Sequence, residues 1–464
     1  MRGNQTEMVA WLVAGLGYGD EGKGTAVDYI TNRRRASVIV RYNGGAQAAH
    51  RVVLVDGREH VFSQFGSGML NAGVLTHLSR FMLVEPIGMM REEEHLSGIG
   101  VPDAFGRTSI DAEAPLITPF HIAAGRIAEM ARKDMRHGSC GLGIGETIED
   151  LRRMGGAALF VGDIRAPQVF RKKLFDVRQR TREKVVDIMS QALSHAEFGK
   201  NMAIFEDPVT MSWCLERCNE FAARVRIVDR GYLKMLLNGR SPVFEGAQGM
   251  LLDRTHGFYP HITKTDITFT NARTLLDEAG YTGDICRVGV LRGYFTRHGA
   301  GPFVTEDADL TRTLQDPANI DHAWQGSFRV GHFDAVAARY AIKAIGGVDE
   351  VVFTNLDRLI GLSELKFADT YLLPKMCDGV CEELFEMHGS SVASDIRVAH
   401  VYDRARQTLL MERLRRARPQ YVNVAAPICH RKDAVEYARI LARELGRLNV
   451  TLSFGPTAED KMVL

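Results

Sequence analysis

The stretch Gly17–Thr25, which reads GYGDEGKGT, constrains the fold of this chain more than any other. An apolar, β-prone run over Val9–Ala14 precedes it, and Ala26–Ile30 after it has helical spacing. The stretch fits the pattern G-x-x-x-x-G-K, in which glycines let backbone N–H groups approach phosphate oxygens while the lysine and a helix N-terminus supply positive potential. The sequence therefore predicts a phosphate-binding loop that joins a strand to a helix.

This loop differs from the ordinary pattern at one position. Gly24 stands where such a loop normally has Ser or Thr, whose hydroxyl contacts Mg²⁺. Asp20 inside the loop is a hard oxygen ligand suited to the same ion, and it could also act as a base. The carboxylate suggests chemistry as well as nucleotide binding; the plainer alternative is a glycine turn with solvated charges.

Short apolar runs alternate with helical stretches along the rest of the chain. Strands are predicted at Ser37–Val40, Ala158–Val161 and Val351–Phe353. This alternation predicts an α/β fold with a large, mostly parallel β-sheet flanked by helices. A long polar helical stretch at about 165–230 interrupts it and is interpreted as a helical subdomain.

Composition agrees with a large enzyme. The chain has 464 residues with 45% hydrophobic content, enough to bury a sizeable core. Its net charge of +1, from 58 basic and 57 acidic residues, gives no sign of a nucleic-acid or membrane partner attracted by bulk charge. The N-terminal Met1–Met8 lacks the apolar run of a signal peptide, and no stretch reaches the roughly 18 apolar residues of a membrane helix. We expect a cytoplasmic location.

Five stretches resemble, in the same order, signatures of the adenylosuccinate synthetase family. They are GDEGKG at 19–24, RYNGGAQAAH at 41–50, FEGAQGMLLD at 244–253, HGFYP at 256–260 with Thr263, and TRHGAGPF at 296–303. The resemblance implies a P-loop-like adenylosuccinate synthetase fold, one domain over 1–464 with the helical excursion at about 165–230. It implies a ligase in which a purine triphosphate, GTP favoured, phosphorylates the 6-oxygen of IMP. The amine of L-aspartate then displaces phosphate to give adenylosuccinate.

The resemblance also implies roles for individual residues. Asp20 matches the base that removes the N1 proton of IMP, an action typically worth roughly a hundred- to ten-thousand-fold in rate. His50 matches the catalytic histidine that donates to the leaving β-phosphate oxygen, and Gln248 matches a further position at the reacting purine. The implied cofactor is Mg²⁺, with Asp20 and the backbone carbonyl of Ala49 as ligands. The family also implies a homodimer.

Other residues fall on family positions that bind the two nucleotides. Those matched to the triphosphate are Gly19, Glu21, Gly22, Lys23, Gly24, Asn355, Asp357, Ser453 and Gly455. Those matched to IMP are Gln47, Ser139, Cys140, Arg153, Gln248, Thr263, Arg297 and His298. Arg153 lies beside the aligned position of an arginine that crosses the family's dimer interface.

The match is less complete at the base of the triphosphate. Asp357 favours guanine, because its carboxylate can accept hydrogen bonds from both N1–H and the exocyclic amine. Asn355 replaces the lysine of the family's T-K-L-D, and Phe454 replaces the threonine of its terminal S-T-G-P. ATP therefore stays open as the alternative donor.

The largest departure lies where the family reads T-T-G-R-R-R-R-T-G-W-L-D and holds the two carboxylates of aspartate. This chain reads AWQGSFRVGHFD at 323–334, so Arg329 alone remains of four arginines. Each lost charge-assisted hydrogen bond is worth roughly 1.5 to 3 kcal/mol. We expect Gly326, Ser327 and Arg329 to form the amine-substrate loop, and the donor to be L-aspartate or another amine.

Two further alternatives remain open. A 2-amino purine nucleotide could replace IMP, although the retained Asp20 argues for a hypoxanthine base, whose N1 proton must be removed. The chain could instead be a catalytically weak nucleotide-binding regulatory protein. Asp20, Lys23 and His50 together favour catalysis.

Overall fold

The computed structural model describes residues 8–190, 198–316, 319, 324–374, 380–425, 427–446 and 449–464. Its main sheet has ten strands among these residues, all parallel to their neighbours except β19, which is antiparallel to β18 at one edge. In spatial order they are β19 (Lys461–Val463), β18 (Val450–Ser453), β13 (Glu350–Thr354), β9 (Asp284–Arg292), β1 (Val9–Gly15), β8 (Pro242–Gly249), β2 (Val38–Arg41), β5 (Leu75–Leu78), β6 (Thr108–Asp111) and β7 (Arg226–Val228). The predicted fold class is confirmed.

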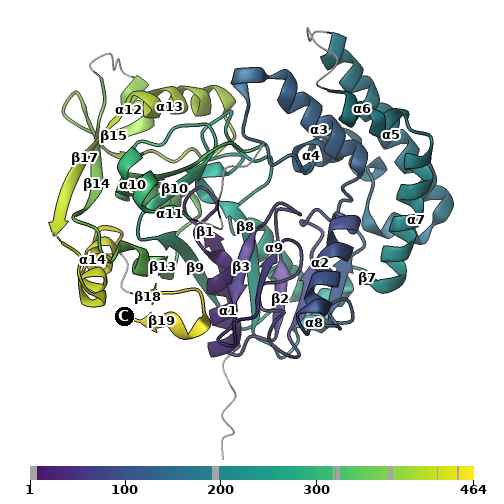
Figure 1. The fold of residues 1–464 in the computed structure, drawn as a ribbon, viewed down its shortest axis with the longest axis horizontal. Helices are drawn as coiled ribbons and strands as arrows, with labels where there is room; N and C mark the ends of the chain where they lie inside the picture. The colour runs from purple at the N-terminus through teal and green to yellow at the C-terminus, as the bar shows by residue number, and fades with distance from the viewer. Residues whose placement is uncertain are drawn as a thin grey trace, which may run out of the picture.

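Helices pack around this sheet (Figure 1). Among the described residues they are α1 (Lys23–Arg33), α2 (Pro86–Gly98), α3 (Pro119–Ala131), α4 (Ile144–Met154), α5 (Pro167–Ser190), α6 (Gly199–Glu206), α7 (Val209–Arg224), α8 (Gly231–Leu237), α9 (Thr270–Ala279), α10 (Ala308–Thr313), α11 (Ala335–Ala344), α12 (Val380–Leu384), α13 (Arg404–Arg416) and α14 (Arg431–Glu444). The central strand β1 is buried on both faces, which is why its sequence is a nearly continuous apolar run. Trp11 and Val13 belong to one buried cluster with α1, and Leu12 belongs to another with α9 and α11.

Smaller sheets stand beside the main one. Two are antiparallel pairs, β3 (His50–Val53) with β4 (Glu59–Phe62), and β10 (Phe295–His298) with β11 (Phe328–Gly331). The third comprises β12 (Phe333–Asp334), β14 (Leu365–Leu372), β16 (Val392–Ile396), β15 (Phe385–His388) and β17 (Arg418–Ala425), and lies at the left in Figure 1.

The helical excursion forms the opposite side of the molecule. Helices α5, α6 and α7 lie between residues 167 and 224 and stand together at the right of Figure 1. Their Phe170, Phe205 and Phe221 belong to a buried cluster that they share with α2, α3 and nearby strands. The strand predicted at Ala158–Val161 is wrong: Phe160 makes only an isolated bridge to Pro115, and a 3-10 helix follows. Buried helical connections and buried strands can share such short apolar runs, so periodicity alone did not separate them.

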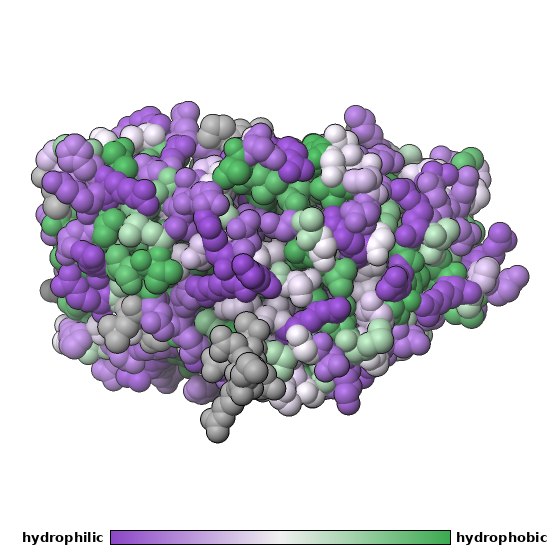
Figure 2. All heavy atoms as spheres, turned by 90° about the horizontal axis from the view of Figure 1, so that it is seen from below, coloured by the Kyte–Doolittle hydropathy of each residue, from purple (hydrophilic) through white to green (hydrophobic). Residues whose placement is uncertain are grey.

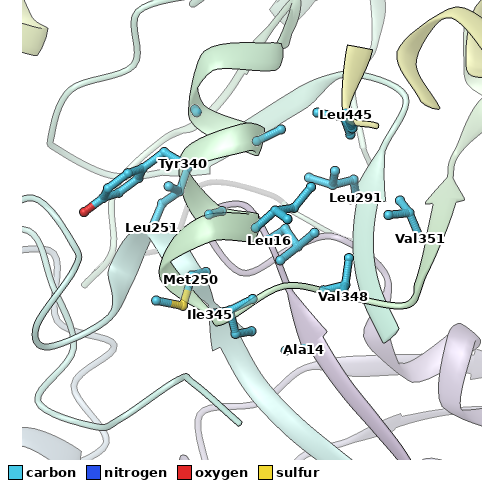
Figure 3. Packing of buried hydrophobic residues seen from close by; sticks show 14 of the residues in the cluster. Ala14, Leu16, Met250, Leu251, Leu291, Tyr340, Ile345, Val348, Val351 and Leu445 are labelled. Atoms are coloured by element: carbon cyan, nitrogen blue, oxygen red, sulfur yellow. The ribbon is translucent and has the colours of Figure 1, made fainter. Parts of the chain in front are cut away.

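The core continues up to the phosphate-binding loop. Leu16 at the start of the loop lies among Leu291, Val348 and Val351, with Ile345 of the α11 end below them (Figure 3). All of these side chains are at most 5% exposed. The loop is therefore anchored at its base by close packing.

Most predicted site segments follow the carboxyl ends of parallel strands. The loop 16–22 follows β1, residues 42–49 follow β2, and Gln248 lies at the end of β8. Arg292 ends β9, and Asn355 follows β13. Parallel α/β sheets bind ligands at this edge, because the chain leaves every strand there as a loop.

Among the described residues, no helix is long and apolar enough to span a bilayer. Figure 2 shows one face of the molecule, on which polar side chains alternate with scattered apolar patches.

Candidate active site

The phosphate-binding loop is held in shape by its own charged residues. The Glu21 carboxylate accepts hydrogen bonds from the amides of Gly17, at 2.9 Å, and Gly19, at 2.7 Å. The Lys23 ammonium donates to the Gly19 carbonyl at 2.6 Å and to Glu21 Oε2 at 2.8 Å. Glu21 therefore faces inward and shapes the loop, while Lys23, which has a third N–H donor, lines the pocket described below.

Gly24 allows a close approach that Ser or Thr would prevent. A Cβ atom at this position would lie 2.7 Å from Cβ of His50. Gly22 before it has a φ of 87°, in the left-handed region that glycine adopts without strain, and directly precedes α1. The missing hydroxyl of the ordinary loop is thus explained by the packing of His50 against the start of α1.

Asp20 is partly buried and surrounded by cations. Its carboxylate lies 3.1 Å from Nδ1 of His298, and its backbone carbonyl accepts a hydrogen bond from Nε of Arg292. Burial by itself raises the pKa of Asp20, but the hydrogen bond and charge of His298, with Arg292 and Lys23, lower that pKa below its ordinary value. Asp20 is therefore ionised at neutral pH, as either a base or a cation ligand requires.

His50 is oriented by a buried carboxylate. Nδ1 of His50 lies 2.5 Å from Oε1 of Glu245, and the other oxygen of Glu245 accepts from the Ser67 amide at 2.9 Å. Although burial opposes its ionisation, Glu245 has a pKa lowered to about 2 by the charge of Arg41 and the hydrogen bonds of His50 and Ser67. Burial lowers the pKa of His50. The contact with Glu245 through Nδ1 leaves Nε2 for another partner.

One pocket contains most of the predicted site. The predicted residues that line it are Gly19, Asp20, Gly22, Lys23, Gly24, Gln47, Ala49, His50, Ser139, Cys140, Gln248, Thr263, Arg297 and His298. They come from segments as far apart in sequence as the phosphate-binding loop and β10, so the tertiary structure brings the separate motifs together.

Several pocket side chains have buried polar atoms without a hydrogen-bond partner among the described residues. These atoms are both amide atoms of Gln47, Nε of Arg297 and Nδ1 of His261. Buried polar groups in proteins are nearly always hydrogen-bonded to protein, water or a ligand, so these atoms have hydrogen-bonding capacity available to a polar ligand in the pocket. Arg297 is 1% exposed, and its guanidinium also donates to the Pro302 carbonyl at 2.7 Å.

Gln248 is held in an unusual backbone conformation. Its φ is 65°, which non-glycine residues seldom adopt. Its side-chain oxygen accepts a hydrogen bond from Thr265 at 2.9 Å, and Thr265 lies 3.0 Å from the hydroxyl of Thr263. This chain of contacts fixes the Gln248 amide at the pocket wall.

The predicted triphosphate-base residues lie outside this pocket lining. Asn355 and Asp357 follow β13, and Ser453 and Gly455 are at the end of the neighbouring strand β18. Both segments touch the loop region: the Thr354 hydroxyl donates to the Glu21 carbonyl at 2.6 Å, and the Thr25 hydroxyl donates to the Pro456 carbonyl at 2.8 Å. The two segments therefore extend the site from the phosphate-binding loop along the sheet edge.

Arg153 is exposed near the end of α4 and does not line the pocket. Its role across a dimer interface stays a prediction.

The predicted amine-substrate residues lie at the start of β11, where Gly326 and Ser327 precede the strand and Arg329 is within it. Ala323, the first residue of the motif, lies outside the described residues, and Gly326, Ser327 and Arg329 do not line the pocket. Arg329 pairs with Arg297 across β10 and β11, and its guanidinium donates to Glu306 and to the carbonyls of Gly299 and Gly301.

The sequence analysis missed several pocket residues. These are Glu129, His261 and Arg292, together with Glu245 behind His50. Glu245 lies inside the FEGAQG motif, where a buried carboxylate between strand residues is a signal that could have identified it. His261 lies between Pro260 and Thr263 of another motif, whereas Glu129 and Arg292 lie outside the motifs.

Glu129 affects the glycine-rich segment 138–145. Its fully buried carboxylate accepts from the amides of Gly138, at 2.7 Å, and Ser139, at 3.1 Å. Two backbone donors of this segment are therefore bonded to the protein's own carboxylate.

Taken together, a phosphate-binding loop at the edge of a parallel sheet, an ionised carboxylate within that loop and an oriented histidine define an α/β enzyme that acts on a nucleotide. The family model of adenylosuccinate synthetase matches residues 12–406. The adenylosuccinate synthetase of Marinomonas sp. (strain MWYL1) is 30% identical over 98% of this chain and 98% of its own. Adenylosuccinate synthetase 1 of Pseudoalteromonas translucida (strain TAC 125) is 35% identical over 78% of this chain and 80% of its own. The chain belongs to the adenylosuccinate synthetase family.

Solved structures share the fold. A fully ligated adenylosuccinate synthetase from Plasmodium falciparum has a TM-score of 0.75 at 19% identity, covering 99% of this chain and 100% of that one. A cyanophage S-2L succinoaminodeoxyadenylate synthetase, bound to dGMP and to dATP as energy donor, has a TM-score of 0.57 at 16% identity, covering 98% and 95%. With the family established, the chain is a ligase that forms a carbon–nitrogen bond in purine biosynthesis.

Proposed function

We propose that this ligase transfers the γ-phosphoryl group of a purine triphosphate, GTP favoured, to the 6-oxygen of IMP. The amine of L-aspartate or another donor then displaces phosphate, and with aspartate the products are adenylosuccinate, GDP and phosphate. One observation carries the proposal: Asp20, Lys23 and His50, from two separate motifs, line one pocket. We also infer a cytoplasmic homodimer, in line with the family.

Asp20 and His50 divide the proton transfers. Asp20, ionised and 24% exposed, accepts the N1 proton of the hypoxanthine base as the 6-oxygen attacks the γ-phosphate. His50 donates through Nε2 to the leaving oxygen. The buried Glu245 carboxylate favours the protonated imidazole as negative charge develops at that oxygen. Because Asp20 suits a base that carries an N1 proton and no bulky 2-amino group, IMP is favoured over a 2-amino purine nucleotide.

The donor set at the loop fits Mg²⁺. Asp20 contributes a carboxylate and the exposed Ala49 a backbone carbonyl, while groups of three or more His, Cys, Asp or Glu side chains suited to a metal ion are absent from the described residues. Mg²⁺ commonly takes one or two protein oxygens and completes its shell with phosphates and water. When bound, the ion would neutralise charge on the transferring phosphoryl group.

The unpaired polar groups support a bound purine nucleotide. The Gln47 amide and Arg297 Nε have hydrogen-bonding capacity that a nucleotide phosphate or ribose could satisfy, with Thr263 and Gln248 on the same wall. Ser139 and Cys140 line the adjoining wall. Arg153 would reach the nucleotide of the second subunit in a dimer.

ATP is the second candidate donor, and the residue at position 454 leaves it open. Phe454, in place of the family's threonine, lies under Arg431, whose guanidinium carbon is 4.3 Å from the ring centroid. This pair forms a flat, stacked surface beside Ser453 and Gly455 that accepts either purine base. Asp357 still favours guanine, since a carboxylate can accept two hydrogen bonds from it.

The test is incubation of the purified protein with IMP, Mg²⁺ and either GTP or ATP, with and without aspartate. Phosphate release and the absorbance of succinyl-adenine are followed together. IMP-dependent phosphate release that disappears in Asp20→Ala supports the proposal, and unchanged release in that variant overturns the assigned mechanism. Silence in every combination favours the regulatory protein.

A further inference from the structure

Arg329 is the remaining arginine of the motif that holds aspartate in the family, and its charge is already neutralised. Its guanidinium donates to the Glu306 carboxylate through one nitrogen and to the Gly299 and Gly301 carbonyls through another. These two carbonyls flank Ala300, which lines the pocket. A substrate carboxylate that approached Arg329 would have to displace Glu306.

Most of the Lys and Arg side chains that line the pocket are also paired with carboxylates of the protein. Among the described residues, ion pairs join Lys23 to Glu21 at 2.8 Å, Arg51 to Glu59 at 2.5 Å, Arg132 to Glu129 at 2.5 Å, Lys264 to Glu149 at 2.6 Å, and Arg292 to Asp316 at 3.2 Å. Among the described Lys and Arg residues that line the pocket, Arg297 alone has no carboxylate within 4 Å. Lys23 keeps a third N–H donor for a phosphate, so among these lining side chains Arg297 is left as the cation that no protein carboxylate pairs.

A dicarboxylate needs more than this. Each carboxylate removed from water requires a charge-assisted partner, most favourably a guanidinium that binds it through two nitrogens. One terminal nitrogen of Arg297 already donates to the Pro302 carbonyl, so the edge that contains Nε is left for one carboxylate bound through two nitrogens. At Arg329, Glu306 takes the place that a second carboxylate would use.

We propose that the amine donor of this enzyme carries at most one carboxylate, and that Glu306 is the specificity-determining residue that disfavours aspartate. This inference rests on the proposed phosphorylation of a purine nucleotide and narrows only the class of the second substrate. The donor class comprises ammonia, simple amines and monocarboxylate amino acids.

The first test is a donor panel with the full-length enzyme, Mg²⁺, IMP and GTP. Ammonia, methylamine, glycine, L-alanine and L-aspartate are compared by mass spectrometry of the purine product. We expect kcat/KM for at least one of the first four to exceed that for aspartate by about tenfold or more. A value for aspartate that exceeds each of the four overturns the inference.

The second test restores a dicarboxylate partner. Glu306→Gln keeps the shape of the side chain and frees the guanidinium of Arg329, so KM for aspartate should fall about tenfold while KM for an uncharged amine stays the same. Glu278→Gln is the matched control, because Glu278 is 44% exposed against 42% for Glu306 and also pairs with a less exposed arginine, Arg80. Equal aspartate KM in the wild type and Glu306→Gln would overturn the role of Glu306.

The half-reaction separates this inference from the proposed function. GTP is labelled with an oxygen isotope at the β,γ-bridging position and is incubated with the enzyme and IMP in the absence of any amine. Exchange of the label between the bridging and non-bridging positions, dependent on IMP, reports transfer of the γ-phosphoryl group. Exchange together with a preference for aspartate overturns the donor class and leaves phosphorylation standing. Absence of exchange and of product with every amine overturns both.

Discussion

The two ends of the pocket use their charged side chains in different ways. At the phosphate-binding loop, Lys23, Asp20 and His50 are held by internal partners that fix their geometry and still leave each group facing the pocket. At strands β10 and β11, Arg329 donates to Glu306 and to two backbone carbonyls, so we infer that it stabilises the structure there instead of binding the substrate. Reaction chemistry needs a supported network and tolerates little change, whereas recognition of the second substrate can change with a few side chains.

The largest effect should come from the loop carboxylate. Asp20→Asn keeps the shape but removes the base, so IMP-dependent phosphate release should fall by about two to four orders of magnitude. Stopped assays of released phosphate measure it. Asp56→Asn, in an exposed turn, is the control and should behave as the wild type. A loss of less than tenfold in Asp20→Asn would mean that the phosphate-binding loop tolerates substitution as well as the end of the pocket at β10 and β11.

The next effect should separate His50 from the residue that orients it. His50→Asn removes a donor to the developing charge and should cost roughly a hundred- to a thousand-fold in kcat. Glu245→Gln leaves the imidazole in place but weakens its orientation, and by analogy with supporting residues of other sites it should cost about ten- to a hundredfold.

The two losses should not add in the double variant, because Glu245 acts through His50. Additive losses would mean that Glu245 has a separate role.

The stability difference between the wild type and Glu245→Gln should also depend on pH. The pKa of Glu245 is depressed to about 2, so its stabilisation is present above its unfolded pKa and is lost as the pH falls from about 4.5 towards 2. The unfolding free energies of the wild type and Glu245→Gln should converge over that interval.

The smallest effect concerns the triphosphate base. Asp357→Asn removes one of the two hydrogen-bond acceptors for guanine, so kcat/KM for GTP should fall by roughly tenfold while that for ATP changes little. Parallel assays with the two triphosphates measure this. An equal fall in kcat/KM for GTP and ATP would mean that Asp357 does not recognise the base. The end of the site at β10 and β11 would then be less altered than the end that holds the triphosphate.

Much of the fold followed from local pattern. The strand before the loop, the helix after it and the strands near residues 38 and 351 form as predicted, because a buried parallel strand needs an apolar run and a phosphate-binding loop needs glycine at fixed positions. The run at 158–161 is equally apolar yet lies buried beside helices, and the five-stranded sheet around β14 had no signal that distinguished it from the main sheet.

For the candidate site, the sequence by itself determined which groups are present: the loop with Asp20 and Lys23, the histidine at 50 and the loss of three arginines near 329. Only the tertiary structure decided how their charges are used. Glu245 lies 195 residues from His50, and Glu306 lies 23 residues from Arg329, so neither pairing has a local pattern. Ion pairs depend on distances in space and on burial, and both arise only when strands remote in sequence pack side by side.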